Sequence, residues 1–117
     1  MKMNTIDLRG AALDWAVAKC EGIEVEYIDD SITRCLLIKP LGSGRYSPST
    51  YWAQGGPIIE REKIRLDTTW NYEDGHWAAR IDSVGGWWEG DTPLIAAMRC
   101  YVASKLGDEV DVPEELK

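Results

Sequence analysis

Phenylalanine is absent from the sequence, histidine occurs once, and no apolar stretch is long enough to cross a membrane. The single histidine, His76, lies in a Gly-His-Trp sequence far from any cysteine. The motifs CxxC, HExxH, GxGxxG and GxxxxGK[ST] are all missing. A zinc site, a histidine-activated nucleophile and a phosphate-binding loop therefore lack their usual signatures. We expect no catalytic residue, no metal site and no cofactor.

Cysteine is scarce and its number is odd. Cys20, Cys35 and Cys100 lie far apart in the sequence, and the first and last fall on apolar faces of predicted helices. Such positions favour buried, reduced thiols. The amino-terminal residues MKMNTIDLRG lack the apolar run of a signal peptide. These features predict three free thiols and a protein of a reducing cytoplasm.

Basic residues are in deficit. Lysine and arginine number 13 against 20 acidic residues, which gives a net charge of −7 and a pI of about 4.6. This balance argues against general affinity for nucleic acid, whose phosphates require a basic face. It leaves room for one local basic pocket, for which the available arginines are Arg45, Arg61, Arg65, Arg80 and Arg99.

The periodicity predicts two main helices and several short strands. The helices are expected at Asp7–Cys20 and Pro93–Leu106, with a short helix at Pro48–Gln54 that Gly55 and Gly56 end. The strands are expected at Ile23–Ile28, Thr33–Lys39, Ile64–Trp70 and Trp77–Val84, with an edge strand at Val110 and Val112. Short links between neighbouring strands favour antiparallel hairpins. The sequence thus predicts one α+β domain over residues 1–117, a small antiparallel β-sheet packed with an N-terminal and a C-terminal helix.

The stretch Tyr46–Glu62, YSPSTYWAQGGPIIERE, concentrates groups that suit a binding loop. Ser49 and Thr50 supply hydroxyls, Gln54 supplies an amide, and Trp52 supplies a face for stacking. Two arginines are candidates for a bidentate hold on phosphate oxygens, Arg61 and Arg99. We predict these six residues as the ligand-binding set.

Tryptophan is abundant, with six residues in a short chain. Trp15 falls on the apolar stripe of the first helix and is expected in the core. Trp70 and Trp77 are expected to pair across two strands. Trp52, Trp87 and Trp88 lie in glycine-bounded segments, where a core role and a contact role are both open. Because so small an interior holds few tryptophans, we expect a homo-oligomer, most simply a dimer.

Three blocks of the sequence resemble the small NinX-like proteins of bacteriophages and prophages. They are LRGAALDWAVAKCEG, YSPSTYWAQGGPIIERE and DTPLIAAMRCYVASKLGDEVDVPEEL, in this order. The chain departs from the family pattern at Tyr51, where Asp is usual, and at Lys63, where Gly is usual. The first change removes a carboxylate from the Ser-Thr-Asp-Trp turn of the family.

The resemblance implies a phage accessory protein that acts in the cytoplasm of the infected host, with no established enzyme activity. One reading is a protein that sequesters a nucleotide-like immune signal of the host, such as a cyclic ADP-ribose derivative or a cyclic dinucleotide. A second reading is an interaction module that docks on a host or phage protein through exposed tryptophans. A third is a small nucleotide hydrolase, which the absence of a clustered acidic motif disfavours.

Overall fold

The computed structural model describes residues 1–30, 32–40, 42–68 and 76–116. Its helices are α1 (Gly10–Glu21), α2 (Trp52–Glu62) and α3 (Pro93–Leu106), with single 3₁₀ turns at Thr5–Asp7 and Glu114–Leu116. Its strands are β1 (Lys2–Asn4), β2 (Val25–Asp29), β3 (Arg34–Ile38), β4 (Arg65–Thr68), β5 (Trp77–Arg80), β6 (Trp88–Gly90) and β7 (Glu109–Asp111). The mixed α+β class is confirmed.

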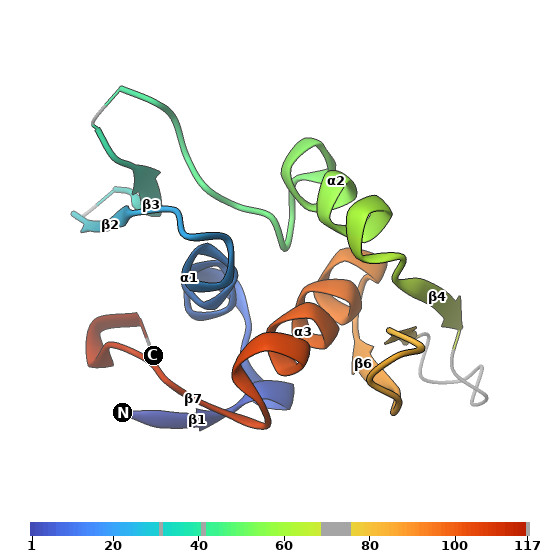
Figure 1. Ribbon diagram of the computed structural model, residues 1–117. Coiled ribbons are helices and arrows are strands. Elements are labelled where there is room, and N and C mark those ends of the chain that lie inside the picture. The colour runs from blue at the N-terminus through green and yellow to red at the C-terminus, as the bar shows by residue number, and fades with distance from the viewer. Residues whose placement is uncertain (31, 41, 69–75, 117) are drawn as a thin grey trace.

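The strands form three small antiparallel sheets. These sheets are the β1–β7 ribbon, the β2–β3 hairpin and the three-stranded sheet β4–β5–β6. Helix α3 packs against α1, α2 and the three-stranded sheet. Figure 1 shows the β2–β3 hairpin beside α1 at one end of the molecule and β4 and β6 beyond α3 at the other. Residues 42–51 lead from the hairpin to α2 (Figure 1).

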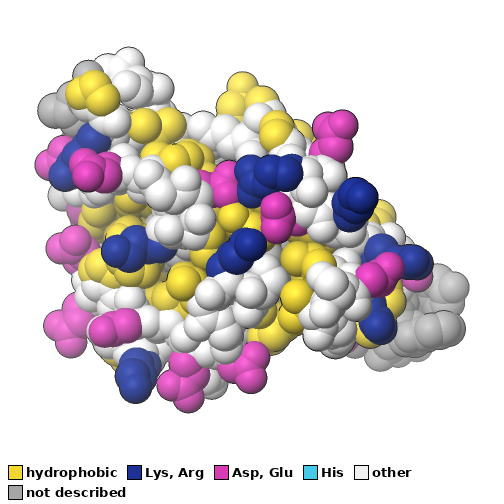
Figure 2. Space-filling model, in the orientation of Figure 1, with side chains coloured by type: hydrophobic (Ala, Val, Ile, Leu, Met, Phe, Trp, Pro, Cys, Tyr) yellow, Lys and Arg dark blue, Asp and Glu magenta, His cyan; other side chains and the backbone are white. Residues whose placement is uncertain are grey.

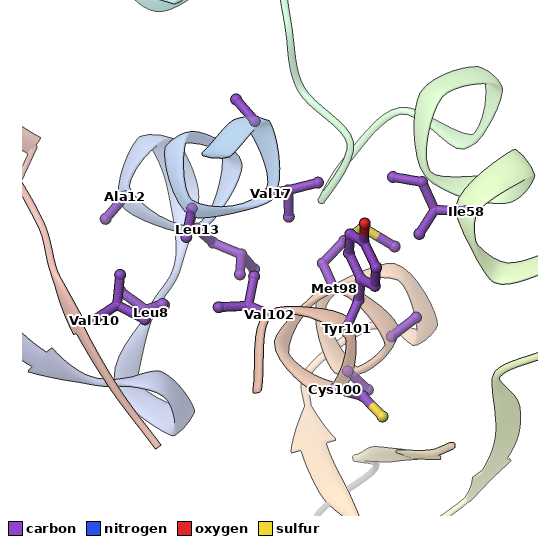
Figure 3. Packing of buried hydrophobic residues seen from close by; sticks show 14 of the residues in the cluster. Leu8, Ala12, Leu13, Val17, Ile58, Met98, Cys100, Tyr101, Val102 and Val110 are labelled. Carbon is purple, nitrogen blue, oxygen red and sulfur yellow. The ribbon is translucent and has the colours of Figure 1, made fainter. Parts of the chain in front are cut away.

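The core lies where α1 meets α3, as Figure 3 shows. Leu13 and Val17 of α1 and Met98 and Val102 of α3 are fully buried, and Ile58 brings α2 onto the same cluster. The predicted bounds of the last helix are confirmed. Its start is fixed by Thr92, whose Oγ1 accepts the Ile95 N–H at 3.1 Å.

Several expected boundaries are wrong. The first helix begins at Gly10 rather than Asp7, because the preceding residues form a separate 3₁₀ turn in which Thr5 is buried and donates to the Gly107 carbonyl. Gly55 and Gly56 do not end a helix but lie inside α2. A Cβ at Gly55 would clash with the Pro48 carbonyl oxygen and with Leu94, so glycine serves close packing there.

The tryptophans divide differently from the expectation. Trp88 lies on β6, pairs with Ala79 and packs against the core, so the segment Gly85–Gly90 is not all loop. The strand Trp77–Val84 ends at Arg80. Trp15 is only partly buried and carries the Lys19 ammonium 5.4 Å from its ring centroid. The predicted pairing of Trp77 with Trp70 lies outside the described residues.

Candidate functional site

The segment that enters α2 is a tight turn built on Ser47. The Ser47 carbonyl accepts the N–H groups of Thr50, at 3.1 Å, and Tyr51, at 2.8 Å. Before this turn, residues 44–46 run alongside β3, where the Tyr46 N–H donates to the Leu36 carbonyl at 2.9 Å. The turn is therefore held at one end by the hairpin and continues at the other into α2.

A buried carboxylate fixes the middle of the turn. Oδ1 of Asp14 on α1 accepts the Ser49 N–H at 2.8 Å, and the two residues are only 6% and 1% exposed. Burial raises the pKa of the Asp14 carboxyl to about 6, while the hydrogen bond from Ser49 acts in the opposite direction. The backbone of Ser49, a residue predicted to contact ligand, thus attaches the turn to α1.

Gln54 also holds the segment in place. Its Oε1 accepts the Ser47 N–H at 2.6 Å, and its Nε2 donates to the Arg45 carbonyl at 2.7 Å. These bonds connect the first turn of α2 to the residues that precede it. Because the oxygen and the nitrogen of the Gln54 amide both bond to backbone groups, this side chain stabilises the shape of the loop.

The predicted phosphate fork of Arg61 is already occupied. Its two terminal nitrogens donate to Oε1 and Oε2 of Glu21 at 3.0 and 2.7 Å, and Nε donates to Glu62 at 2.9 Å. The hydroxyl of Tyr101 donates to the same Glu21 carboxylate at 2.6 Å. Arg61 accordingly holds the pKa of Glu21 below its usual value. This cluster connects α1, α2 and α3.

Arg99 is also engaged, by backbone carbonyls. Its Nε donates to the Leu8 carbonyl and one terminal nitrogen donates to the Glu89 carbonyl, both at 2.8 Å. Burial lowers the pKa of its guanidinium. Arg61 and Arg99 line neither of the two hollows described next, so the structure does not bring the six predicted residues together.

Two hollows meet at Thr50. The larger, of about 520 Å³, is lined by Ser43, Gly44, Arg45, Ser47, Thr50, Tyr51 and Gln54. The smaller, of about 280 Å³, is lined by Ser49, Thr50, Trp52, Thr92, Pro93 and Leu94. Tyr51 and Trp52 are 57% and 53% exposed. These hollows are the candidate site, and its predicted members are Ser49, Thr50, Trp52 and Gln54.

Arg45 is the main member of the site outside the six predicted residues, although it was one of the five arginines available for a basic pocket. It is exposed, makes no ion pair with any residue of the described segments, and is the one charged residue lining the two hollows. The available signal was its position directly before Tyr46, in a glycine-containing loop. This position indicates a binding role only once the pairing of residues 44–46 with β3 is known, because that pairing places Arg45 beside the larger hollow.

Metal-ligand clusters and membrane-spanning helices are both absent from the described parts of the chain. Over residues 1–30, 32–40, 42–68 and 76–116, no three histidine, cysteine or acidic side chains lie together as metal ligands would. None of the helices in these ranges has the length and hydrophobicity needed to cross a membrane. His76 lies 3.3 Å from the carboxylate of Asp91 at the surface.

A family model described as Bacteriophage P22, NinX matches residues 4–105. The match spans the candidate site and the three helices except for Leu106 at the end of α3, and it confirms the resemblance drawn from the sequence blocks. No curated protein matches the chain.

Proposed function

The chain belongs to the bacteriophage P22 NinX family, and we propose that it is a non-catalytic accessory protein that sequesters a nucleotide-like host molecule. The ligand class we propose comprises cyclic ADP-ribose derivatives and cyclic dinucleotides, acting as immune signals in the host cytoplasm. These molecules combine negatively charged phosphates with flat purine rings. The two hollows around Thr50 offer a matching group for each part.

The observation that carries this proposal is the charge of the larger hollow. The whole chain has a net charge of −7, yet this hollow is lined by no acidic residue and by one arginine. Arg45 has no carboxylate partner among the described residues. A guanidinium without a carboxylate partner is suited to a bidentate hold on phosphate oxygens, and none of the residues that line this hollow is acidic.

The neutral groups of the site favour the same ligand class. Ser47 and Thr50 line the larger hollow, and their hydroxyls are donors for phosphate or ribose oxygens. The Ser43 hydroxyl also borders it but already donates to the Pro40 carbonyl at 2.8 Å. Tyr51 borders this hollow and Trp52 borders the smaller one, and both rings are more than half exposed. Exposed rings of this kind stack on bases. The volume of about 520 Å³ lies within the range of small-molecule sites.

Calorimetric titration with cyclic ADP-ribose isomers and cyclic dinucleotides tests the proposal. We expect the wild type to bind at least one of them, and Arg45→Ala and Trp52→Ala to weaken binding by about tenfold or more. The matched control is Arg34→Ala, which removes another exposed arginine from the hairpin and is expected to bind normally. Far-UV circular dichroism checks that each variant is folded. The absence of binding by the folded wild type contradicts sequestration.

Docking on a host or phage protein is the second candidate, and the exposure of Tyr51 and Trp52 favours it. Large aromatic side chains are enriched at the centres of protein interfaces. This alternative differs from sequestration in its dependence on Arg45. Under docking, Trp52→Ala and Tyr51→Ala abolish co-purification of a protein partner, and the nucleotide titrations give no heat. Under sequestration, the wild type binds a nucleotide with measurable heat, Arg45→Ala weakens that binding, and no protein partner co-purifies.

A further inference from the structure

We propose that the outer edge of β2 accepts an extended, lysine- or arginine-containing segment of a partner protein as an added β-strand. This surface is separate from the hollows around Thr50, and the proposal does not depend on the function proposed for them. Three features carry it: an unpaired strand edge, a hollow between that edge and α1, and acidic side chains along the strand. Strand addition uses main-chain hydrogen bonds for affinity and alternate side chains for specificity.

The hairpin has one covered edge and one open edge. On the β3 side, the Ile38 N–H donates to the Gly44 carbonyl and the Tyr46 N–H donates to the Leu36 carbonyl, both at 2.9 Å. Residues 44–46 therefore cover the outer edge of β3. Nothing comparable covers β2 in the described parts of the chain.

The register shows which groups of β2 face outward. The Lys39 N–H donates to the Glu24 carbonyl at 3.0 Å, so residues at even positions of β2 bond to β3. The main-chain groups of Val25, Tyr27 and Asp29 consequently point away from β3. Their N–H and C=O groups have no partner among the described residues. An exposed row of this kind is a template for another strand.

A hollow of about 350 Å³ lies between the start of β2 and α1. Trp15 and Ala18 of α1 and Val25 of β2 contribute apolar surface to it. Lys19, Lys39 and Glu24 also line the hollow, so its walls combine apolar surface with charges of both signs. Figure 2 shows hydrophobic side chains exposed over α1 between the hairpin and the β1–β7 ribbon. A side chain of the added strand can occupy this space.

The opposite face of β2 is acidic. Val25 and Tyr27 pack against the core, and the alternation of the strand places Glu26 and Ile28 on the other face, together with Glu24 directly before the strand. Both glutamates are exposed, and Lys39 lies opposite Glu24. Opposite charges on adjacent strands stabilise their pairing, and like charges oppose it. The added strand should therefore alternate, with basic side chains beside the two glutamates and apolar side chains on the side of α1.

The same charges argue against a second copy of this chain as the occupant. A β2 strand pairing with another β2 strand would bring Glu24 and Glu26 beside the acidic residues of its neighbour. Such an arrangement is destabilising, and charged edges are a common protection against self-association. The partner class is therefore a different protein with a basic, extended segment.

The test uses a capped heptapeptide of alternating lysine and valine, followed by amide hydrogen exchange in NMR. We expect the peptide to slow exchange at the amides of Val25, Tyr27 and Asp29. A matched peptide with glutamate in place of lysine is expected to give no protection. Protection confined to other residues, no protection at saturating peptide, or equal protection by both peptides would overturn the proposal.

A charge-reversal pair sharpens the test. Glu24→Lys combined with Glu26→Lys should weaken binding of the lysine peptide by about tenfold or more. Glu114→Lys combined with Glu115→Lys makes the same change in net charge at exposed positions away from β2, and should bind as the wild type does. Equal weakening of both variants would show attraction by net charge alone and would overturn the strand site. If the first variant does not fold, the glutamine versions of both pairs replace them.

Discussion

Asp14 offers the sharpest test of how the Ser47–Tyr51 turn is attached to the rest of the molecule. Its carboxyl lies inside the fold, 6% exposed, and accepts the Ser49 N–H at 2.8 Å. Asp14→Asn keeps an acceptor oxygen for this bond and removes the charge. The substitution therefore separates the hydrogen bond, which we expect to be needed, from the ionised state, which burial disfavours.

The size of the effect follows from the pKa of Asp14. Burial raises this pKa from 3.8 to about 6. At pH values between these two pKa values, the folded chain holds a proton on Asp14 that the unfolded chain has released. The contribution of Asp14 to the free energy of unfolding therefore falls as pH rises from about 4 to about 7. At 1.36 kcal/mol per pKa unit, the loss amounts to about 3 kcal/mol.

Urea unfolding at pH 4, 5, 6 and 7.5 measures this effect in the wild type and in Asp14→Asn. The free energy of unfolding of the variant, minus that of the wild type, should increase by about 2 kcal/mol between pH 4 and pH 7.5, because the first part of the loss already lies below pH 4. Any fixed cost of burying the asparagine amide cancels in this comparison, and so do groups that titrate equally in both proteins. Parallel pH profiles for the two proteins would refute the assignment of Asp14 as a buried, proton-binding anchor.

Three further predictions concern other parts of the fold. Met98→Asp should lower the free energy of unfolding by about 4 kcal/mol or more, because a fully buried methionine becomes an unpaired carboxylate; an unchanged thermal midpoint contradicts this. Glu21→Gln should lower the free energy of unfolding at pH 7, because Arg61 holds the pKa of Glu21 in the folded chain below its ordinary value of 4.5. The difference between variant and wild type should shrink as pH falls through that lowered pKa, and denaturant titrations at pH 7 and pH 3 measure it. Light scattering at micromolar concentration should give the mass of a homo-oligomer, most simply a dimer, and a strictly monomeric mass refutes that prediction.

The sequence was most informative where local signals were sufficient. Thr92, Pro93 and Gly107 mark the ends of α3, and the apolar residues between them identify its core position. The hairpin β2–β3 followed from alternation and a short turn. For α2 the same rules failed. Two glycines and a proline normally interrupt a helix, and only the contact of Gly55 with Pro48 and Leu94 explains their presence inside one.

The candidate site was predictable only in part, because its members depend on distant contacts. Thr50 and Trp52 were accessible from composition and loop chemistry. Arg61 and Arg99 were attractive as free cations, but their partners come from α1, α2, β6 and the segment before α1, which no local pattern reveals. Arg45 becomes significant only because residues 44–46 run beside β3 and turn toward α2.

Native mass spectrometry of the protein purified from bacterial cells tests the central claim most directly. We expect the wild type to carry an additional mass of a small, phosphate-containing molecule, and Arg45→Ala to lose it while Arg34→Ala retains it. A wild type without any small-molecule adduct from cells that produce such signals, or one that carries the adduct equally with and without Arg45, would contradict capture at this site.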